Sequence, residues 1–272
     1  MIGYKIIALD LDGTLTNSDK IITPETKQAL FEFQEKGGKI VLASGRPTQG
    51  IVPIAKELEL DEYGGYILAF NGSRMVDFET KEVLFNQTLT MEEVADLHRL
   101  AVEYKVNILT YEDENILTEN AEDPYAKIEQ KITNMNLVQV EDISKALSKE
   151  ANKCLMTGEP EHLARVEQLV KEQMQGRIEV YRSQDFFLEL VPKCVDKAAS
   201  LSKLLEALHI SRNDLIACGD GYNDLSMIQY AGLGVAMSNA NQDIQDAADY
   251  VTFSNDEDGI AHVLHKFVFL AA

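Results

Sequence analysis

The chain has 272 residues, which is enough for one large domain or two smaller ones around a hydrophobic core. Its hydrophobic fraction of 45% and charged fraction of 26% are typical of a soluble globular protein. No window of about 18 uncharged apolar residues suggests a transmembrane helix, and the net charge of −20 disfavours binding to nucleic acid or to an anionic membrane.

The first residues and the cysteines point to the same class of protein. The first residues lack a small-residue cleavage site and reach acidic side chains early, so they predict a strand and not a signal peptide. The three cysteines, Cys154, Cys194 and Cys218, match no disulfide or metal spacing. We therefore expect reduced, mostly buried thiols in a cytoplasmic protein.

Apolar runs and helical periods alternate at the start of the chain. Residues 4–11 form a largely apolar run typical of a strand that is covered on both faces. Thr23 and Pro24 predict the start of a helix that ends near Lys36, before two glycines. The remaining predicted elements of this part are a strand, a helix and a strand, over residues 39–43, 47–58 and 66–70. This order predicts parallel β-α-β units and a doubly wound, Rossmann-like sheet.

The middle of the chain has a different pattern. Residues 73–87 predict a hairpin, and Thr90 with Glu93 predicts a capping box for a helix that ends near Tyr104. A helix over 160–175 and two antiparallel strands around 183–184 follow after shorter pieces. We interpret residues 87–190 as an inserted α+β domain within a core made of residues 1–86 and 191–272.

The last third returns to the alternating pattern of the first. The predicted helices cover residues 196–208, 222–231, 241–248 and 259–269, and the predicted strands cover 214–220, 233–237 and 250–253. The predicted fold class is therefore α/β, a doubly wound parallel sheet with an inserted α+β cap.

Polar residues follow the predicted strands of the core, where open α/β sheets bind ligands. These residues are Asp10 and Asp12 after the first strand, Ser44, Gly45 and Arg46 after the second, Asn71 and Gly72 after the third, and Gly219, Asp220, Asn223 and Asp224 after the strand over 214–220. So many carboxylates require a cation, and a hard ion such as Mg²⁺ suits oxygen ligands and substrate phosphates. A carboxylate can then attack phosphorus while a second acid moves the proton.

Four motifs of the sequence resemble those of the haloacid dehalogenase-like hydrolases. They are DLDGT over residues 10–14, SGR over 44–46, Lys197, and GDGYND over 219–224. Their order, with an insert between the second and third, resembles the Cof-type subfamily and its YidA-like sugar phosphatases. The resemblance implies a Rossmann-like core with a C2-type cap.

The resemblance also implies roles for individual residues. Asp10 would be the nucleophile and a metal ligand, and Asp12 the general acid/base with its backbone carbonyl on Mg²⁺. Asp220 and Asp224 would belong to the metal site, and Lys197 would bind the phosphate and the nucleophile. The remaining positions would contact the substrate: Ser44, Asn223 and the N–H groups of Leu11 and Gly45 its phosphate, with Arg46 as a candidate substrate contact.

Purely structural interpretations exist for several of these positions. Asp-x-Asp at the end of a strand is also found in turns and helix caps, and Lys197 opens an amphipathic helix where surface lysines are common. The family's lysine is usually followed by glycine, whereas this chain has Ala198. Asn71-Gly72 is a standard turn pair, and the five histidines (His98, His162, His209, His262 and His265) have no paired metal spacing, so they receive no role.

The sequence therefore predicts an Mg²⁺-dependent phosphatase of small phosphorylated metabolites, with sugar phosphates as the expected class and the insert as the specificity domain. Two alternatives stay open: a sugar phosphomutase of the same chemistry, and a non-catalytic regulator that binds a phosphorylated metabolite. The sequence does not identify the substrate or the oligomeric state.

Overall fold

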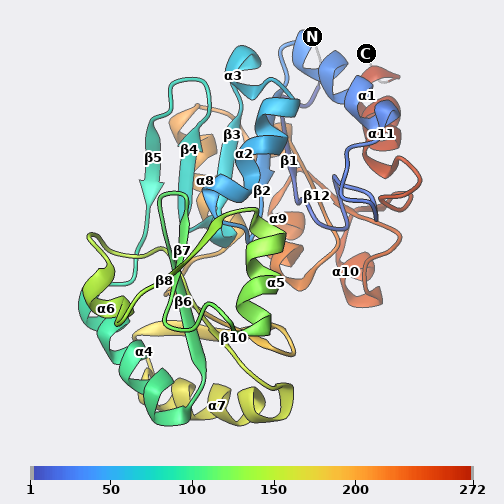
Figure 1. Ribbon diagram of the computed structural model, residues 1–272. Helices are drawn as coiled ribbons and strands as arrows, with labels where there is room; N and C mark the ends of the chain where they lie inside the picture. Colours follow the sequence, from blue (N-terminus) through green and yellow to red (C-terminus); the bar gives the residue numbers. More distant parts are fainter. Residues whose placement is uncertain (1–2, 271–272) are drawn as a thin grey trace. The chain divides into compact units, whose positions relative to one another are not determined.

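The computed structural model describes residues 3–270 and shows two units along the chain (Figure 1). One unit takes the chain up to Phe85 together with the chain from Asp196 onward, and the other is Asn86–Val195. The chain therefore returns to the first unit at Asp196, whereas the sequence analysis predicts that this part of the core begins at residue 191. No helix within residues 3–270 is both long and apolar enough to cross a membrane.

The first unit is built on an eight-stranded sheet in the order β14-β13-β12-β1-β2-β3-β4-β5. The strands are β1 (Ile6–Leu9), β2 (Lys39–Ala43), β3 (Tyr66–Ala69), β4 (Arg74–Asp77), β5 (Val83–Asn86), β12 (Leu215–Gly219), β13 (Leu233–Ala236) and β14 (Tyr250–Val251). β1 pairs in parallel with β2 on one side and with β12 on the other. The strand order therefore reverses direction at β1, which confirms the predicted doubly wound α/β fold.

The first unit has helices both before and after the insert. They are α1 (Pro24–Glu35), α2 (Thr48–Glu57), α3 (Leu60–Tyr63), α8 (Lys197–Ala207), α9 (Leu225–Tyr230), α10 (Gln242–Ala247) and α11 (Gly259–Leu264). Thr23 caps α1 by accepting a hydrogen bond from the Thr26 amide, and Asp196 caps α8 in the same way. The predicted helix over 222–231 is shorter than expected, because Tyr222–Asp224 forms a separate 3₁₀ turn.

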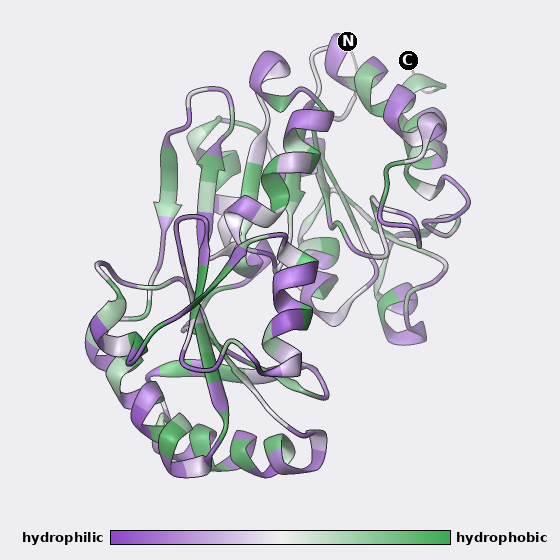
Figure 2. Cartoon of the chain, in the orientation of Figure 1, coloured by the Kyte–Doolittle hydropathy of each residue, from purple (hydrophilic) through white to green (hydrophobic). Residues whose placement is uncertain are grey.

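The central strands have continuous apolar sequences because they are buried on both faces. All four residues of β1 are fully buried, and alternate ones, Ile6 and Ala8, pack with Leu201 and Leu204 of α8. Figure 2 shows hydrophobic strands and largely hydrophilic loops. A sheet that is covered on both faces holds the residues after its strand ends in fixed positions.

The inserted unit has its own sheet and its own hydrophobic core. Its strands are β6 (Asn107–Glu112), β7 (Asn115–Thr118), β8 (Asn136–Gln139), β9 (Cys154–Thr157), β10 (Ile178–Gln184) and β11 (Phe187–Pro192), and its helices are α4 (Met91–Tyr104), α5 (Pro124–Thr133), α6 (Ile143–Ala146) and α7 (Pro160–Gln173). The strand order is β10-β11-β9-β6-β7-β8. Thr90 and Glu93 form the predicted capping box of α4, and β10 pairs with β11 antiparallel. The unit is therefore of the α+β kind that the sequence predicts.

Candidate active site

Three acidic or hydroxyl residues of the first unit follow neighbouring parallel strands. Asp10 comes directly after β1, Ser44 after β2 and Asp220 after β12. Since β1 pairs in parallel with both other strands, the three strand ends lie at one edge of the sheet. This is the edge at which open α/β sheets bind ligands.

Lys197 joins three parts of this edge, although its side chain is fully buried. Its Nζ donates to Asp10 Oδ1 at 2.6 Å, to Asp224 Oδ1 at 2.5 Å and to the Ala43 carbonyl at 2.8 Å. Burial lowers the pKa of Lys197, but the charges of Asp10 and Asp224 outweigh it and raise that pKa to about 12. Lys197 is thus a permanent cation between two carboxylates.

Asp10 has the most strongly perturbed carboxyl group of this edge. Burial, followed by the nearby Asp224 carboxylate, raises the pKa of Asp10 to about 8, against the lowering effect of Lys197. One lysine therefore does not balance the negative charge of the cluster. A further cation beside Asp10 would favour its ionised form.

Asp220 and Asp224 complete an acidic cluster with Asp10. Each of the three offers a carboxylate oxygen within 4.8 Å of those of the other two. Asp224 Oδ2 accepts the amide hydrogens of Asp220 and Gly221 at 3.1 and 2.9 Å, and Thr14 Oγ1 donates to Asp220 Oδ1 at 2.7 Å. These bonds fix both carboxylates, and the pKa of Asp220 is raised mainly by burial.

The loop after β1 approaches Asp220 closely enough to require glycine. Gly13 has φ +88°, and a Cβ atom there would lie 2.4 Å from Asp220 Oδ2. A residue with a side chain would both strain the backbone and displace the carboxylate.

The Asp12 carboxylate is bound by Arg46 and Lys20 and not by Lys197. Arg46 binds its carboxylate through two nitrogens, Nε to Oδ2 at 2.8 Å and Nη2 to Oδ1 at 2.6 Å, and Lys20 Nζ donates to Oδ1 at 2.9 Å. Burial raises the pKa of Asp12, but the hydrogen bonds and charges of Arg46 and Lys20 together lower it below its ordinary value. The Asp12 side chain is thus held apart from the three-carboxylate cluster.

The remaining predicted positions surround a second polar group. Ser44 Oγ is buried and accepts the Arg46 amide hydrogen at 3.1 Å. Asn223 Nδ2 donates to Asn71 Oδ1 at 3.1 Å, and Asn71 stands at φ +55° close beside Gly45. Asn71 therefore belongs to this site, a role that the sequence leaves as a minor one because Asn-Gly is common in turns.

The structure brings most of the predicted site residues into two groups besides the polar one around Ser44 and Asn223. The first contains Asp10, Lys197, Asp220 and Asp224, and the second pairs Asp12 with Arg46. Sequence reasoning missed Thr14, which donates to Asp220, and Lys20, which donates to Asp12. Thr14 lies within the DLDGT motif, and a hydroxyl in such a motif is a signal that could have revealed this contact.

The donor atoms of the cluster suit a hard divalent ion. All three groups that converge are carboxylates, with no histidine or cysteine among them. Oxygen-only ligands favour Mg²⁺ or Ca²⁺ over zinc-like metals. Both carboxylate oxygens of Asp224 already accept hydrogen bonds, so Asp10 and Asp220 are the more available ligands.

The chain matches known proteins over nearly its whole length. A family model described as haloacid dehalogenase-like hydrolase matches residues 7–264. A Bacillus subtilis protein named 5-amino-6-(5-phospho-D-ribitylamino)uracil phosphatase YcsE is 27% identical over 274 residues, which cover 98% of this chain and 97% of that protein.

Two solved structures have the same fold. A haloacid dehalogenase-like hydrolase from Bacteroides thetaiotaomicron has a TM-score of 0.94 and 47% identity, covering 97% of this chain and 99% of that one. A sugar phosphatase of HAD subclass IIB, BT4131, has a TM-score of 0.81 and 27% identity, and the match covers 97% of this chain and 98% of that one. These matches confirm the predicted resemblance, and the chain belongs to the haloacid dehalogenase-like hydrolases as an enzyme of the phosphatase type.

Proposed function

We propose that the protein is an Mg²⁺-dependent phosphatase that hydrolyses small phosphorylated metabolites, with sugar phosphates as its substrate class. The reaction would pass through an aspartyl-phosphate on Asp10. The observation that carries this proposal is the convergence of the Asp10, Asp220 and Asp224 carboxylates within 4.8 Å of one another, beside a lysine fully buried against Asp10.

Asp10, Asp220 and the backbone carbonyl of Asp12 would hold the Mg²⁺ ion. Asp224 would support them, either as a further ligand or through its hydrogen bonds to the Asp220 backbone and Lys197. When bound, Mg²⁺ would offset the charge that accumulates on the phosphate oxygens and on the nearby carboxylates.

Asp10 would act as the nucleophile. One of its carboxylate oxygens would form a bond to phosphorus as the bond from phosphorus to the leaving alcohol oxygen breaks. Lys197 orients this carboxylate through its contact with Oδ1 and would interact with the incoming phosphate. Its second contact, to Asp224, fixes the position of the ammonium group.

Asp12 would move the proton in both half-reactions. Because Arg46 and Lys20 keep the pKa of the Asp12 carboxyl low, the proton would arrive with the substrate phosphate; Asp12 would pass it to the leaving alcohol oxygen and then accept a proton from the water that attacks the aspartyl-phosphate. The bidentate contact with Arg46 fixes the orientation of the Asp12 carboxylate. We assign Arg46 to this positioning role, and contact with the substrate stays a prediction for it.

Ser44, Asn223 and the amide groups of Leu11 and Gly45 would bind the phosphate oxygens. Ser44 directly follows β2, which supports this role, and Asn71 accepts a hydrogen bond from the Asn223 side chain. These groups are neutral donors, so they add orientation without further charge.

The inserted unit would select the substrate. It has a hydrophobic core of its own and joins the first unit next to Asn86 and Val195, which suits a body that moves as a whole during turnover. YcsE is named a 5-amino-6-(5-phospho-D-ribitylamino)uracil phosphatase and BT4131 a sugar phosphatase, which supports phosphorylated sugar-like compounds as the substrate class.

The direct test is a substrate panel. The full chain with Mg²⁺ would be incubated with hexose, pentose and polyol phosphates, and both released inorganic phosphate and remaining sugar phosphates would be measured. Phosphate release with free sugar supports the proposal. An isomeric sugar phosphate would instead show a phosphomutase, and the absence of any turnover across the panel would favour a binding protein.

A further inference from the structure

Two loops near the end of the chain reach the loop that follows β1. Asn239 comes shortly after β13, and Asn255 comes shortly after β14. β13 pairs in parallel with β12, and β14 pairs in parallel with β13. Both loops therefore begin at the edge of the sheet that also carries Asp10 and Asp220.

Hydrogen bonds join these two asparagines to the loop after β1 and to each other. Asn239 Nδ2 donates to the Gly13 carbonyl at 2.9 Å, and Asn255 Nδ2 donates to the Thr16 carbonyl at 2.9 Å. The backbone amide of Asn255 donates to Asn239 Oδ1 at 3.2 Å. Asn239 thus uses both ends of its side-chain amide, which an aspartate in its place could not do because a carboxylate cannot donate to a carbonyl.

The two loops that carry the asparagines are themselves fixed to the sheet. The Met237 amide donates to the Gly219 carbonyl at 3.1 Å, and the Thr252 amide donates to the Ala236 carbonyl at 3.0 Å. The Thr252 side chain is buried. The asparagine side chains therefore extend from an anchored backbone and can hold a neighbouring loop in place.

The backbone at Gly13 depends on contacts from outside its own loop. Gly13 has φ +88° and no side chain to restrict its rotation. The peptide unit of its carbonyl also carries the amide of Thr14, whose Oγ1 donates to Asp220 Oδ1 at 2.7 Å. The preceding peptide unit carries the Asp12 carbonyl, a proposed Mg²⁺ ligand. A rotation at Gly13 would therefore move two groups of the metal site together.

We propose that Asn239 and Asn255 are positioning residues of the metal site. They hold the backbone at Gly13 and thereby keep the Asp12 carbonyl and the Thr14 hydroxyl in place for Mg²⁺ binding. This role rests on the Mg²⁺ site of the proposed function, and it adds two residues that act on that site through the backbone of the loop after β1.

Both asparagines are neutral, which separates their role from that of the charged residues of the site. Loss of a neutral amide changes the geometry of the metal ligands and leaves the net charge of the site unchanged. Mg²⁺ binding should therefore weaken by about fivefold, the effect of losing one hydrogen bond of ordinary strength. Excess Mg²⁺ should still fill the weakened site.

The loops after β1 and β14 also meet at a contact that does not involve Gly13. Asp256 accepts the Ser18 amide hydrogen at 2.8 Å and the Ser18 hydroxyl hydrogen at 2.7 Å, and both residues are exposed. Ser18→Ala removes the hydroxyl bond but keeps the bond to the Gly13 carbonyl. It is therefore the matched control for a loss of contact between these loops.

The test is Mg²⁺ binding to the full chain by isothermal titration calorimetry without substrate. We expect Asn239→Ala to weaken binding about fivefold and Asn255→Ala to weaken it as well, whereas Ser18→Ala should bind like the parent. A second readout uses a sugar phosphate that the parent hydrolyses. Turnover by Asn239→Ala should fall at limiting Mg²⁺ and recover at saturating Mg²⁺, which a general loss of structure would not produce.

The outcomes separate this role from the proposed function. An unchanged Mg²⁺ affinity in Asn239→Ala, or an equal loss in Asn239→Ala and Ser18→Ala, would overturn the positioning role alone. Absence of Mg²⁺ binding by the parent chain would overturn the metal site together with this role. If Asn239→Ala does not fold by circular dichroism, Asn255→Ala takes its place and must show weaker binding than Ser18→Ala.

Discussion

Lys197 Nζ lies 2.6 Å from Asp10 Oδ1 and holds the carboxylate of the proposed nucleophile within a fully buried ion pair. The same ammonium lies 2.5 Å from Asp224 Oδ1. Two buried carboxylates thus depend on one cation, which makes the lysine both a structural and a chemical requirement of the site.

Lys197→Met should remove that cation while keeping the length of the side chain. We expect unfolding by urea to show a loss of about 3–5 kcal/mol, because two buried carboxylates lose their partner. Phosphatase turnover should fall by about 10²–10³. Retained turnover in a stably folded Lys197→Met protein would remove the lysine from the mechanism.

Gly13→Ala should disturb Asp220 through a direct clash. The added Cβ would lie 2.4 Å from Asp220 Oδ2. Gly37→Ala is its matched control, since Gly37 has nearly the same φ, +87° against +88°, but a methyl group there would meet no atom within 4 Å. Both variants should lose roughly 1–2 kcal/mol of stability from backbone strain.

The two glycine variants should differ in Mg²⁺ affinity. Calorimetric titration should show at least about tenfold weaker binding for Gly13→Ala and unchanged binding for Gly37→Ala. Similar affinities for the two would mean that the Asp220 position does not determine metal binding.

Much of this site follows from the sequence, and the reasons are local. The carboxylates of Asp10 and Asp220 follow strands whose apolar runs are continuous, so both their order and their common edge were predictable. The role of Lys197 could be predicted only from the order of the motifs, because a lysine at the start of an amphipathic helix has no distinguishing local pattern.

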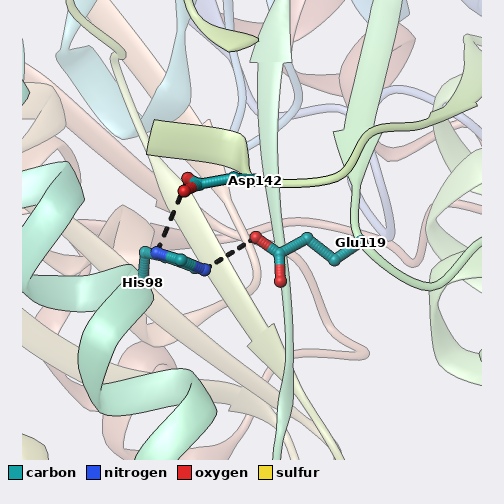
Figure 3. Close-up of side chains that lie close together, drawn as sticks. All are labelled: His98, Glu119 and Asp142. Atoms are coloured by element: carbon teal, nitrogen blue, oxygen red, sulfur yellow. Dashed lines mark ion pairs between the residues drawn. The ribbon is translucent and has the colours of Figure 1, made fainter. Parts of the chain in front are cut away.

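The missed contacts depend on tertiary structure. Lys20 reaches Asp12 only because the loop after β1 returns toward it, and Asn71 reaches Asn223 from another part of the chain. His98 lies near Glu119 and Asp142 (Figure 3) only after the inserted sheet has formed, so helical spacing could not reveal it. The α9 helix begins at Leu225, later than predicted, because the Asp224 side chain accepts backbone hydrogens within the preceding turn.

Arg46→Met should change how stability depends on pH. Because the pKa of Asp12 is lowered in the folded protein, the ionised carboxylate stabilises the fold at pH values above its ordinary pKa of 3.8. This stabilisation is lost as the pH falls through the folded-state pKa. In metal-free buffer, the drop in unfolding free energy between about pH 7 and about pH 3 should be smaller for Arg46→Met than for the parent. Lys20→Met should show a weaker effect, as Lys20 is more exposed. Identical pH profiles for the parent and Arg46→Met would contradict this interpretation.

Removal of divalent metal should destabilise the first unit. Mg²⁺ at about 100 times its dissociation constant stabilises a protein by about 2.7 kcal/mol, so thermal unfolding should occur at a lower temperature in EDTA. Asp220→Asn should lose most of this difference, whereas Asp243→Asn, an exposed acid on α10, should keep it. A shift that is the same in both variants would place the bound Mg²⁺ elsewhere.

The most direct test of the central claim is to trap the phosphorylated enzyme. The full chain with Mg²⁺ would be mixed with a sugar phosphate that it turns over, quenched in acid and analysed by peptide mass spectrometry. The proposed mechanism predicts one added phosphoryl group on Asp10, absent from Asp10→Asn. Full turnover by Asp10→Asn, or a phosphoryl group on another residue, would contradict it.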